Sequence, residues 1–344
     1  MNDILKSLKG RFLKLKYAIK TSPTDKIITI QLIENKFNRY LFPFVFMLHS
    51  NGFKPVLLVK NHELAHMFYD NYQRLIFKKG LLFKSSKNMN VVKEIVLDPD
   101  YFTALLDTEK RKAVIPMSMH PLIYNNNIKP LKNNKSNRIV LFAGMINHIS
   151  HNKKQVFENI ITRYQCFKLI LKFLNHVHIK NKKDEKNAIP LDDGCFFLIY
   201  DRKSYDLNHQ LLFEKLSKSS FFLALPGRGM PLCHNVIEAM FCGCIPIIQD
   251  EYAKMFPTQL ENDVNCITYK KEEDFKNISK IINNLDFKTI EYLRNNVRKY
   301  YQDHLSPSAI SKFILNHQNN YFYLQAEGRS ISLYVQNKEN VNKY

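Results

Sequence analysis

The sequence predicts an α/β protein made of two Rossmann-like βαβ domains. Its 344 residues exceed one ordinary domain and fit two. Short, continuously apolar segments alternate with helical patterns, which is typical of parallel sheets covered by helices on both faces. A polar stretch at 125–137 interrupts this alternation, which then starts again, so it is the expected linker between domains at 21–124 and 138–305. A C-terminal helix and polar tail follow at 306–344.

Residues 1–20 form a segment of their own, with an amphipathic and basic helix predicted over 3–20. Its apolar residues recur every three or four positions and form one stripe, which consists of Leu5, Leu8, Phe12, Leu15 and Ile19. Basic residues fill most of the other positions, namely Lys6, Lys9, Arg11, Lys14, Lys16 and Lys20. Such a helix can lie on an anionic membrane surface, or it can pack on its own domain with a basic face in solvent. Both interpretations stay open.

The first domain is expected to contain four buried strands with helices between them. A helical pattern covers 38–50, where Gly52 would end it, and another helix follows Asn61, which can cap it. The expected strands are 27–33, 55–60, 91–97 and 113–116.

In the second domain the same alternation predicts strands at 138–143, 195–200, 221–225 and 245–248. Helices are expected at 153–176, 209–218, 232–242, 272–284, 288–303 and 307–318, and a charged loop at 180–186. The polar residues near the C-terminus are expected to be loosely held.

The composition narrows the function classes. A formal charge of +20 indicates an anionic partner such as nucleic acid, acidic lipid or a phosphorylated substrate. No helix-turn-helix, zinc-finger or RNP-type signature accompanies the charge, so nucleic acid is not the expected partner, although a basic nucleic-acid-binding protein stays an alternative. Six scattered cysteines without a CxxC pair, no apolar signal segment and no run of about 18 apolar residues predict a cytoplasmic protein without a transmembrane helix.

A literal HExxH occurs at His62, Glu63 and His66. On a helix, both imidazoles would share one face and could chelate zinc, with the glutamate activating a bound water. Tyrosines at 69 and 72 stand where the extended motif needs Gly and His, and no third ligand is evident. We therefore expect an ordinary covering helix and no metal, with a zinc metallopeptidase as an alternative.

The Asp98-Pro99-Asp100 segment has two interpretations. A DxD can hold a divalent metal and a nucleotide diphosphate in one class of sugar-transferring enzymes. Proline fits the first position of a helix, so the favoured interpretation is that Asp98 caps a helix beginning at Pro99.

The segment 221–250 carries the strongest functional signal. A buried strand runs into Pro226-Gly227-Arg228-Gly229, and a helix follows at 232–242. Glycines after a strand let the backbone approach a ligand, and the following helix N-terminus favours a phosphate. Arg228 adds a fork for a diphosphate, and Glu238 can accept from ribose hydroxyls. An ordinary βαβ turn with a solvated glutamate is the plainer alternative.

Those residues resemble the donor-binding end of exostosin-like glycosyltransferases and, more broadly, of the two-Rossmann-domain (GT-B) glycosyltransferases. The likeness spans about 138–270 and includes 138–144, which resembles the first strand and phosphate-side loop of the donor domain and ends at Gly144. The matching motifs are Pro226-x-Arg228, Glu238-Ala239, Gly243-Cys244-Ile245-Pro246 and Asp250-x-Tyr252. In the family, the residue matching Glu238 contacts the donor nucleoside. Retaining members carry another glutamate where this chain has Met230, which favours an inverting enzyme.

The resemblance implies a GT-B fold with its domains facing a cleft, and an inverting, metal-independent glycosyltransferase that builds a surface glycan of the capsule or lipopolysaccharide type. It uses a nucleotide sugar as substrate, no cofactor, and a glycan or lipid-linked acceptor. The enzyme is expected in the cytoplasm, where the basic helix can also place it at the inner face of the cell membrane. The expected donor-binding residues are Gly144, Arg202, Gly227, Arg228, Gly229, Asn235 and Glu238, with Lys153 and Lys154 as further cations. The candidate general bases are His120, Glu34 and Asp98. A nucleotide-sugar epimerase or hydrolase of the same fold is the nearest alternative.

Overall fold

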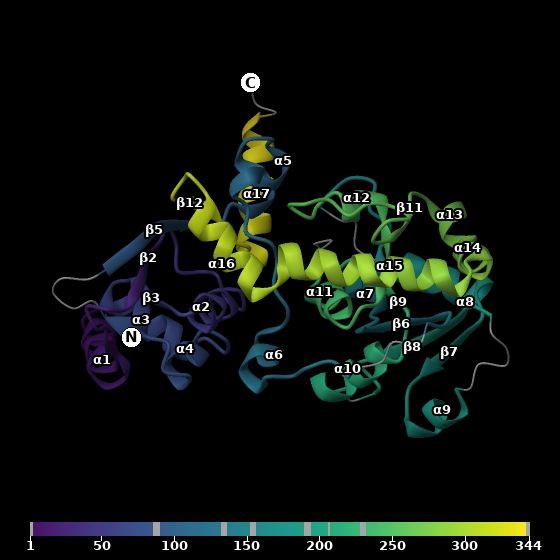
Figure 1. The fold of residues 1–344 in the computed structure, drawn as a ribbon, viewed down its shortest axis with the longest axis horizontal. Coiled ribbons are helices and arrows are strands. Elements are labelled where there is room, and N and C mark those ends of the chain that lie inside the picture. The colour runs from purple at the N-terminus through teal and green to yellow at the C-terminus, as the bar shows by residue number, and fades with distance from the viewer. Residues whose placement is uncertain are drawn as a thin grey trace. The chain divides into compact units, whose positions relative to one another are not determined.

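The computed structural model describes residues 3–84, 90–131, 136–151, 156–188, 194–205, 207–227 and 232–341. The chain divides into two compact units, the first made of Met1–Asn126 and His304–Tyr344 and the second of Asn127–Asp303 (Figure 1). The boundary at Asn126 falls within the polar stretch 125–137. Each unit has its own parallel sheet, so the predicted α/β class with two Rossmann-like sheets is confirmed.

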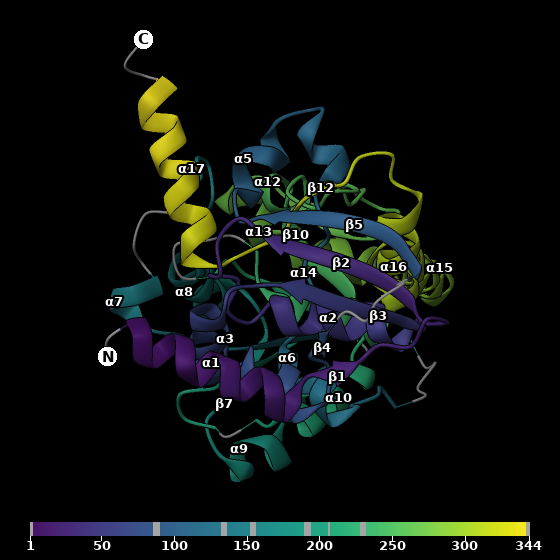
Figure 2. The ribbon, with the colours of Figure 1, turned by 90° about the vertical axis from the view of Figure 1, so that its left-hand side faces the viewer.

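The first unit is built on a four-stranded parallel sheet in the order β12-β5-β2-β3 (Figure 2). Its strands are β2 (Lys26–Leu32), β3 (Phe53–Leu58), β5 (Asn90–Asp98) and β12 (Tyr321–Tyr323). In the central strand β2, Ile27, Ile28 and Ile30 are fully buried, because helices cover this sheet. A separate parallel pair joins β1 (Ile19–Lys20) to β4 (Phe83–Lys84).

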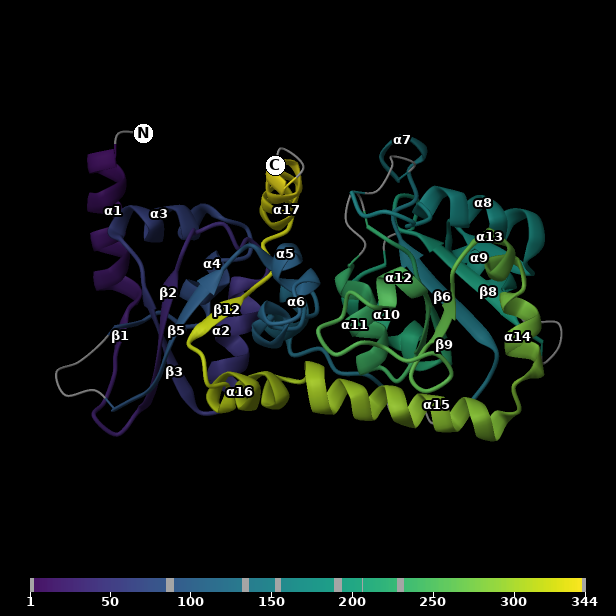
Figure 3. The ribbon, with the colours of Figure 1, turned by 90° about the horizontal axis from the view of Figure 1, so that it is seen from above.

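The helices of the first unit lie mainly between its strands in the sequence. They are α1 (Asp3–Tyr17), α2 (Leu41–Ser50), α3 (Asn61–Tyr69), α4 (Arg74–Lys78), α5 (Tyr101–Leu106), the 3₁₀ helix η1 (Lys110–Ala113), α6 (Pro121–Asn126), α16 (Pro307–Asn316) and α17 (Gly328–Val341). Helix α1 packs against α3, which Figure 3 shows beside it. None of the described helices is long and apolar enough to cross a membrane.

The C-terminal segment belongs to the first unit, whereas the sequence predicts a helix and loose polar tail at 306–344. Strand β12 pairs with β5, helix α16 packs on α2, and α17 packs on α5. Phe322, Leu324 and Ala326 are buried, which anchors the segment in the core of the unit. A three-residue strand carries too little periodicity to be recognised from sequence.

The second unit contains a six-stranded parallel sheet in the order β11-β10-β9-β6-β8-β7. Its strands are β6 (Ile139–Gly144), β7 (His176–Ile179), β8 (Phe196–Asp201), β9 (Phe221–Ala224), β10 (Ile245–Gln249) and β11 (Ile267–Tyr269). Its helices are α7 (His148–His151), α8 (Arg163–Phe173), α9 (Lys182–Asn187), α10 (His209–Ser217), α11 (His234–Phe241), α12 (Asp250–Ala253), α13 (Glu272–Lys276), α14 (Ile278–Asn284) and α15 (Phe287–Tyr300). The π-helical turn η2 (Tyr301–Leu305) follows α15.

Several sequence expectations differ from the observed elements. The helix expected over 3–20 ends at Tyr17 and is followed by β1, and the helix expected at 272–284 is divided into α13 and α14. The predicted strand at 113–116 is a single bridge from Val114 to Tyr323 after the 3₁₀ helix η1. The predicted helix at 153–176 is shorter, because Thr162 caps α8 and strand β7 already begins at His176. The charged stretch 180–186 forms the short helix α9, which Asn181 caps by accepting from two backbone amides.

Candidate functional site

The strand order of the second unit creates a topological switch point between β6 and β9. After β6 the chain continues to β7 and β8 on one side, and after β9 it continues to β10 and β11 on the other. Val140 and Leu141 of β6 lie beside Phe221 and Phe222 of β9. Ligands of open parallel sheets bind at the carboxyl ends of the strands at such a point. A ligand-binding site is therefore expected at the segments that follow Gly144 and Ala224.

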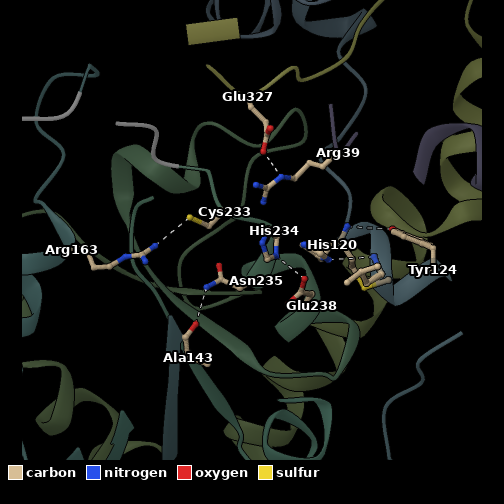
Figure 4. Close-up of polar contacts among 12 residues, drawn as sticks. Arg39, His120, Tyr124, Ala143, Arg163, Cys233, His234, Asn235, Glu238 and Glu327 are labelled. Atoms are coloured by element: carbon tan, nitrogen blue, oxygen red, sulfur yellow. Dashed lines mark hydrogen bonds and ion pairs between the residues drawn. The ribbon is translucent and has the colours of Figure 1, made fainter. Parts of the chain in front are cut away.

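A buried arginine joins these two loops. Arg163, the first residue of α8, donates from Nε to the Pro226 carbonyl at 2.8 Å and from Nη1 to the Met145 carbonyl at 3.0 Å. Its Nη2 lies 3.5 Å from the Cys233 sulfur, just before α11 (Figure 4). One guanidinium thus holds three backbone segments at the switch point, since its planar fork donates in fixed directions.

Sequence reasoning missed Arg163, although a local signal was present. Thr162 and Gln165 form a capping box, in which the threonine hydroxyl accepts from the Gln165 amide and the Gln165 side chain accepts from the Thr162 amide. This T-x-x-Q pattern marks the start of α8 and places residue 163 at the sheet edge. Because the sequence analysis expected one helix over 153–176, it did not recognise a helix start at residue 163.

Gly144 ends β6 at a crowded position. A Cβ there would lie 2.9 Å from the Phe142 ring and 3.3 Å from Nη1 of Arg163, so a larger residue would shift the Phe142 ring and crowd the arginine. The Gly144 carbonyl accepts from the Arg202 amide at 3.2 Å. The structure therefore brings these two predicted residues together through their backbones, while the Arg202 side chain is exposed.

Helix α11 carries two more predicted donor residues. Asn235 donates from Nδ2 to the Ala143 carbonyl at 3.3 Å, and its buried Oδ1 accepts no hydrogen bond from the residues that the structure describes. Glu238 is fully buried, and its Oε1 lies 2.7 Å from Nδ1 of His234, one turn earlier (Figure 4). His234 was not among the predicted donor residues. The i, i+4 spacing that brings the two side chains together is visible in the sequence.

Further polar groups surround Glu238. Burial lowers the pKa of His209, at the start of α10, and the Glu238 carboxylate partly opposes that effect while Arg202 and His234 reinforce it. Glu238 is thus a buried carboxylate with two imidazoles nearby, those of His234 and His209. Such a carboxylate is suited to accept hydrogen bonds from ligand hydroxyls, because water does not compete for it.

Of the remaining predicted donor residues, the structure describes only Gly227. Gly227 is buried shortly after β9, next to the Pro226 carbonyl that accepts from Arg163. Arg228, Gly229 and Met230 lie outside the described residues, as do Lys153 and Lys154.

The carboxyl ends of β10 and β11 border an open pocket of about 620 Å³. Buried Gln249 accepts from the Ile161 amide at 2.9 Å and donates to the Lys270 carbonyl at 3.2 Å, so it fixes the segment before α8 against β11. The pocket lining includes Asn159, Lys271 and Glu272. The side chain of Tyr252 is fully buried. Its hydroxyl accepts from the Cys233 amide at 2.6 Å, which connects α12 to the segment just before α11.

The three candidate general bases lie in the first unit. Glu34, just after β2, accepts from Arg329 Nε at 2.8 Å on one oxygen, pairs with another Arg329 nitrogen through the other, and lies 3.5 Å from Lys36. The Arg329 hydrogen bonds, ahead of partial burial that opposes them, hold the pKa of Glu34 below its usual value. Glu34 is therefore ionised at neutral pH and remains partly exposed.

Asp98 and His120 have their acceptor atoms engaged. Asp98, the last residue of β5, accepts from the Asp100 amide at 2.7 Å and from the Tyr321 hydroxyl. The expected cap differs, because α5 begins at Tyr101 and its N-cap is Asp100. His120 is buried, and its Nδ1 accepts from the Leu122 amide at 3.3 Å, which puts the proton of the neutral ring on Nε2.

The HExxH residues lie at the start of α3, and Glu63 caps that helix. Its Oε2 accepts from the Lys60 amide at 2.6 Å. His66 is exposed and His62 half-buried. Within the described part of the chain, no group of three His, Cys, Asp or Glu side chains is arranged to hold a metal ion. Cys242 and Cys244, on either side of Gly243, are both buried free thiols.

No family model and no curated protein sequence matches the chain. Among solved structures, it is similar to Anabaena Alr3699/HepE in complex with UDP and glucose, with 8% identity, a TM-score of 0.39, and coverage of 83% of this chain and 98% of that one. A second is an alpha-glucosyltransferase in complex with UDP and DNA, with 14% identity, a TM-score of 0.42, and coverage of 84% and 98%. A third is a glycosyltransferase from Rickettsia africae, with 9% identity, a TM-score of 0.39, and coverage of 86% and 100%. These likenesses are distant, so the function is argued from the chain's own residues.

Proposed function

We propose that the protein is a glycosyltransferase of the GT-B type that takes its sugar from a nucleotide-activated donor. One observation carries the proposal. The segment whose sequence resembles the donor-binding end of exostosin-like glycosyltransferases contains strand β9, helix α11 and strand β10 at the switch point of the second unit, with Glu238 buried beside His234. This is where parallel sheets bind nucleotides.

The donor site would use three kinds of group. Glu238 would accept from the ribose hydroxyls, with His234 fixing the orientation of its carboxylate. The positive end of the α11 dipole and the guanidinium of Arg228 would stabilise the diphosphate as it leaves. Arg163 would position the loops after β6 and β9 without touching the substrate. No cofactor is needed, because the nucleotide sugar is itself a substrate.

We propose Glu34 as the general base that activates the acceptor. The acceptor oxygen attacks the anomeric carbon, its proton passes to the Glu34 carboxylate, and the bond to the diphosphate oxygen breaks with inversion. Glu34 is favoured over His120 because its carboxylate is ionised and partly exposed, whereas the His120 ring is buried and its Nδ1 accepts from the Leu122 amide. Asp98, whose two oxygens each accept a hydrogen bond as those of Glu34 do, is the next candidate.

The biological setting is proposed from the same family resemblance. The acceptor would be a growing surface glycan, free or lipid-linked, of the capsule or lipopolysaccharide type. The enzyme would work in the cytoplasm at the inner face of the cell membrane. The strongly basic composition, with a formal charge of +20, supports an anionic partner such as a nucleotide sugar or an acidic membrane.

The test is to incubate the full chain with a panel of nucleotide sugars, with and without EDTA, and to measure release of nucleoside diphosphate. We expect release from one donor or a few, undiminished by EDTA, and a loss of about 10²-fold in Arg228→Ala, the scale of one charge-assisted contact to a developing anion. Proton NMR of the product should show an inverted anomeric centre. No reaction with any donor, or conversion of a donor to its epimer alone, would overturn the proposal.

A further inference from the structure

Helix α1 has two opposite faces, and only one of them is packed. Gly10 and Leu13 are buried against the unit, with Tyr17 half-buried beside Phe68 and Phe77. A Cβ on Gly10 would collide with the backbone of Asn61, so α1 and α3 are in backbone contact there. The helix is therefore held in place before any partner arrives, and Figures 2 and 3 both show it alongside α3.

The other face of α1 is apolar and exposed. Ile4, Leu5, Leu8, Phe12 and Leu15 are between 56% and 74% exposed. At about 3.6 residues per turn, these five side chains share one side of the helix, roughly opposite Gly10 and Leu13. The apolar stripe predicted from sequence thus does not pack on its own domain. Soluble proteins rarely leave so many large apolar side chains together on the surface unless the patch binds something.

Cations border this stripe on both sides. Arg11 and Lys14 lie along one flank and Lys16 along the other, and all three are exposed. Lys16 extends over the Phe12 ring at 5.9 Å, and Lys9 donates to the Tyr69 hydroxyl of α3. Residues 3–20 contain six basic side chains and a single acidic one, Asp3. A second copy of the chain would bring the same positive charge to the contact, which disfavours self-association through this face.

We infer that the outer face of α1 is a docking surface for an anionic lipid bilayer. The apolar stripe enters the boundary between headgroups and acyl chains, and the flanking cations bind lipid phosphates. The docked inner face keeps the helix parallel to the membrane and fixes which side of the first unit faces the lipid. This inference goes beyond glycosyl transfer and does not depend on it.

Surface substitutions test this better than deletion of the helix. Removing residues 1–20 would expose the groups that Gly10 and Leu13 cover and would take away β1, which pairs with β4. Replacing the exposed side chains leaves that packing intact. The lipid variants are therefore Leu8→Ser with Phe12→Ser and Leu15→Ser, and separately Arg11→Glu with Lys16→Glu.

Matched controls carry the same chemistry elsewhere. Leu171→Ser with Tyr292→Ser removes exposed apolar side chains from the second unit, and Lys182→Glu with Lys183→Glu reverses exposed charges on α9. The thermal midpoint of every variant should stay near that of the wild type, because each altered side chain is exposed.

The experiment is co-sedimentation of the full chain with vesicles of phosphatidylcholine alone or mixed equally with phosphatidylglycerol. We expect binding to the anionic vesicles at low salt and less at high salt, where the Debye length falls below about 8 Å. Both lipid variants should bind the anionic vesicles at least roughly tenfold more weakly than the wild type, and both controls should bind like the wild type. A wild type that stays in the supernatant at low salt overturns the inference. So does a self-association, seen by light scattering, that the lipid variants abolish without any change in vesicle binding.

Discussion

The two parallel sheets end in different chemistry at their carboxyl edges. In the second unit, a buried arginine and a half-buried asparagine, Arg163 and Asn235, bond to the backbone of neighbouring segments. In the first unit, carboxylates pair with arginines, Glu34 with Arg329 and Glu327 with Arg39, and all four side chains are partly exposed.

Under the proposed function, this difference corresponds to a division of tasks between donor binding and acceptor binding. Buried contacts to the backbone fix loop positions and respond little to salt, which suits a site that always binds the same nucleotide. Partly exposed ion pairs are weaker and depend on pH and salt. They leave charged groups at the surface, where they can meet a variable acceptor. We therefore expect changes in the second unit to alter donor binding and stability, and changes in the first to alter turnover.

The largest expected effect is on turnover in Glu34→Gln. The amide keeps the shape of the side chain but cannot accept a proton, so kcat should fall by about 10²- to 10⁴-fold while donor affinity is unchanged. Steady-state kinetics with donor and acceptor measure both quantities. Glu109→Gln, an exposed carboxylate of the same unit, is the control. Full turnover in Glu34→Gln would show that Glu34 is not the general base and would leave His120 and Asp98 as the candidates.

Glu238→Gln should act on donor binding instead. The carboxylate is fully buried and bonded to His234, so its loss weakens the interaction with ribose hydroxyls. We expect a rise of roughly tenfold or more in donor KM, on the scale of a charge-assisted hydrogen bond. The control Glu291→Gln changes an exposed carboxylate on α15. Unchanged donor KM in Glu238→Gln would place the ribose elsewhere.

Arg163→Ala should destabilise the second unit by about 2–4 kcal/mol. The substitution leaves the Pro226 and Met145 carbonyls without their buried donor. Urea unfolding of the variant and of Lys168→Ala, an exposed cation on the same helix, measures the difference. Equal stability of the two variants would show that Arg163 does not hold the loops together.

The fold and part of the donor site could be predicted because their signals are local. Continuous apolar segments predicted β2, β6 and β9, and the segment around Glu238 is contiguous in sequence. The arrangement that depends on distant residues could not be predicted. Arg329 and Glu34 are 295 positions apart in the sequence, so no local pattern predicts their contact. Strand β12 has only three residues, which is too short for its periodicity to be recognised. The exposure of the α1 stripe also depends on tertiary packing, since the pattern alone does not say which face docks.

The Glu34–Arg329 pair gives a smaller effect with a definite sign. The folded pKa of Glu34 is lowered, so the pair stabilises the protein above the ordinary glutamate pKa and loses this effect as the pH falls through the lowered value. Arg329→Gln should therefore cost about 0.5–1 kcal/mol at neutral pH, as expected for a partly exposed pair. Unfolding curves from neutral to acid pH should converge for wild type and variant. A gap that widens toward acid pH would contradict the assignment.

The smallest expected effect concerns the HExxH. Glu63→Ala removes the side chain that caps α3 and should cost about 0.5–1 kcal/mol, with transfer activity retained. Thermal unfolding and the transfer assay measure both. If the variant folds but loses activity, or if EDTA abolishes activity in the wild type, the residues would have a metal-dependent role.

The most direct test of the central claim, that the edge between β6 and β9 binds the nucleotide, is calorimetric titration of the full chain with nucleoside diphosphates. We predict that at least one of them binds the wild type and Glu34→Gln equally, and binds Glu238→Gln roughly tenfold more weakly. Absence of binding by every nucleotide tested would contradict the claim. Equal binding to Glu238→Gln, with loss in Glu34→Gln, would place the nucleotide in the first unit and contradict it as well.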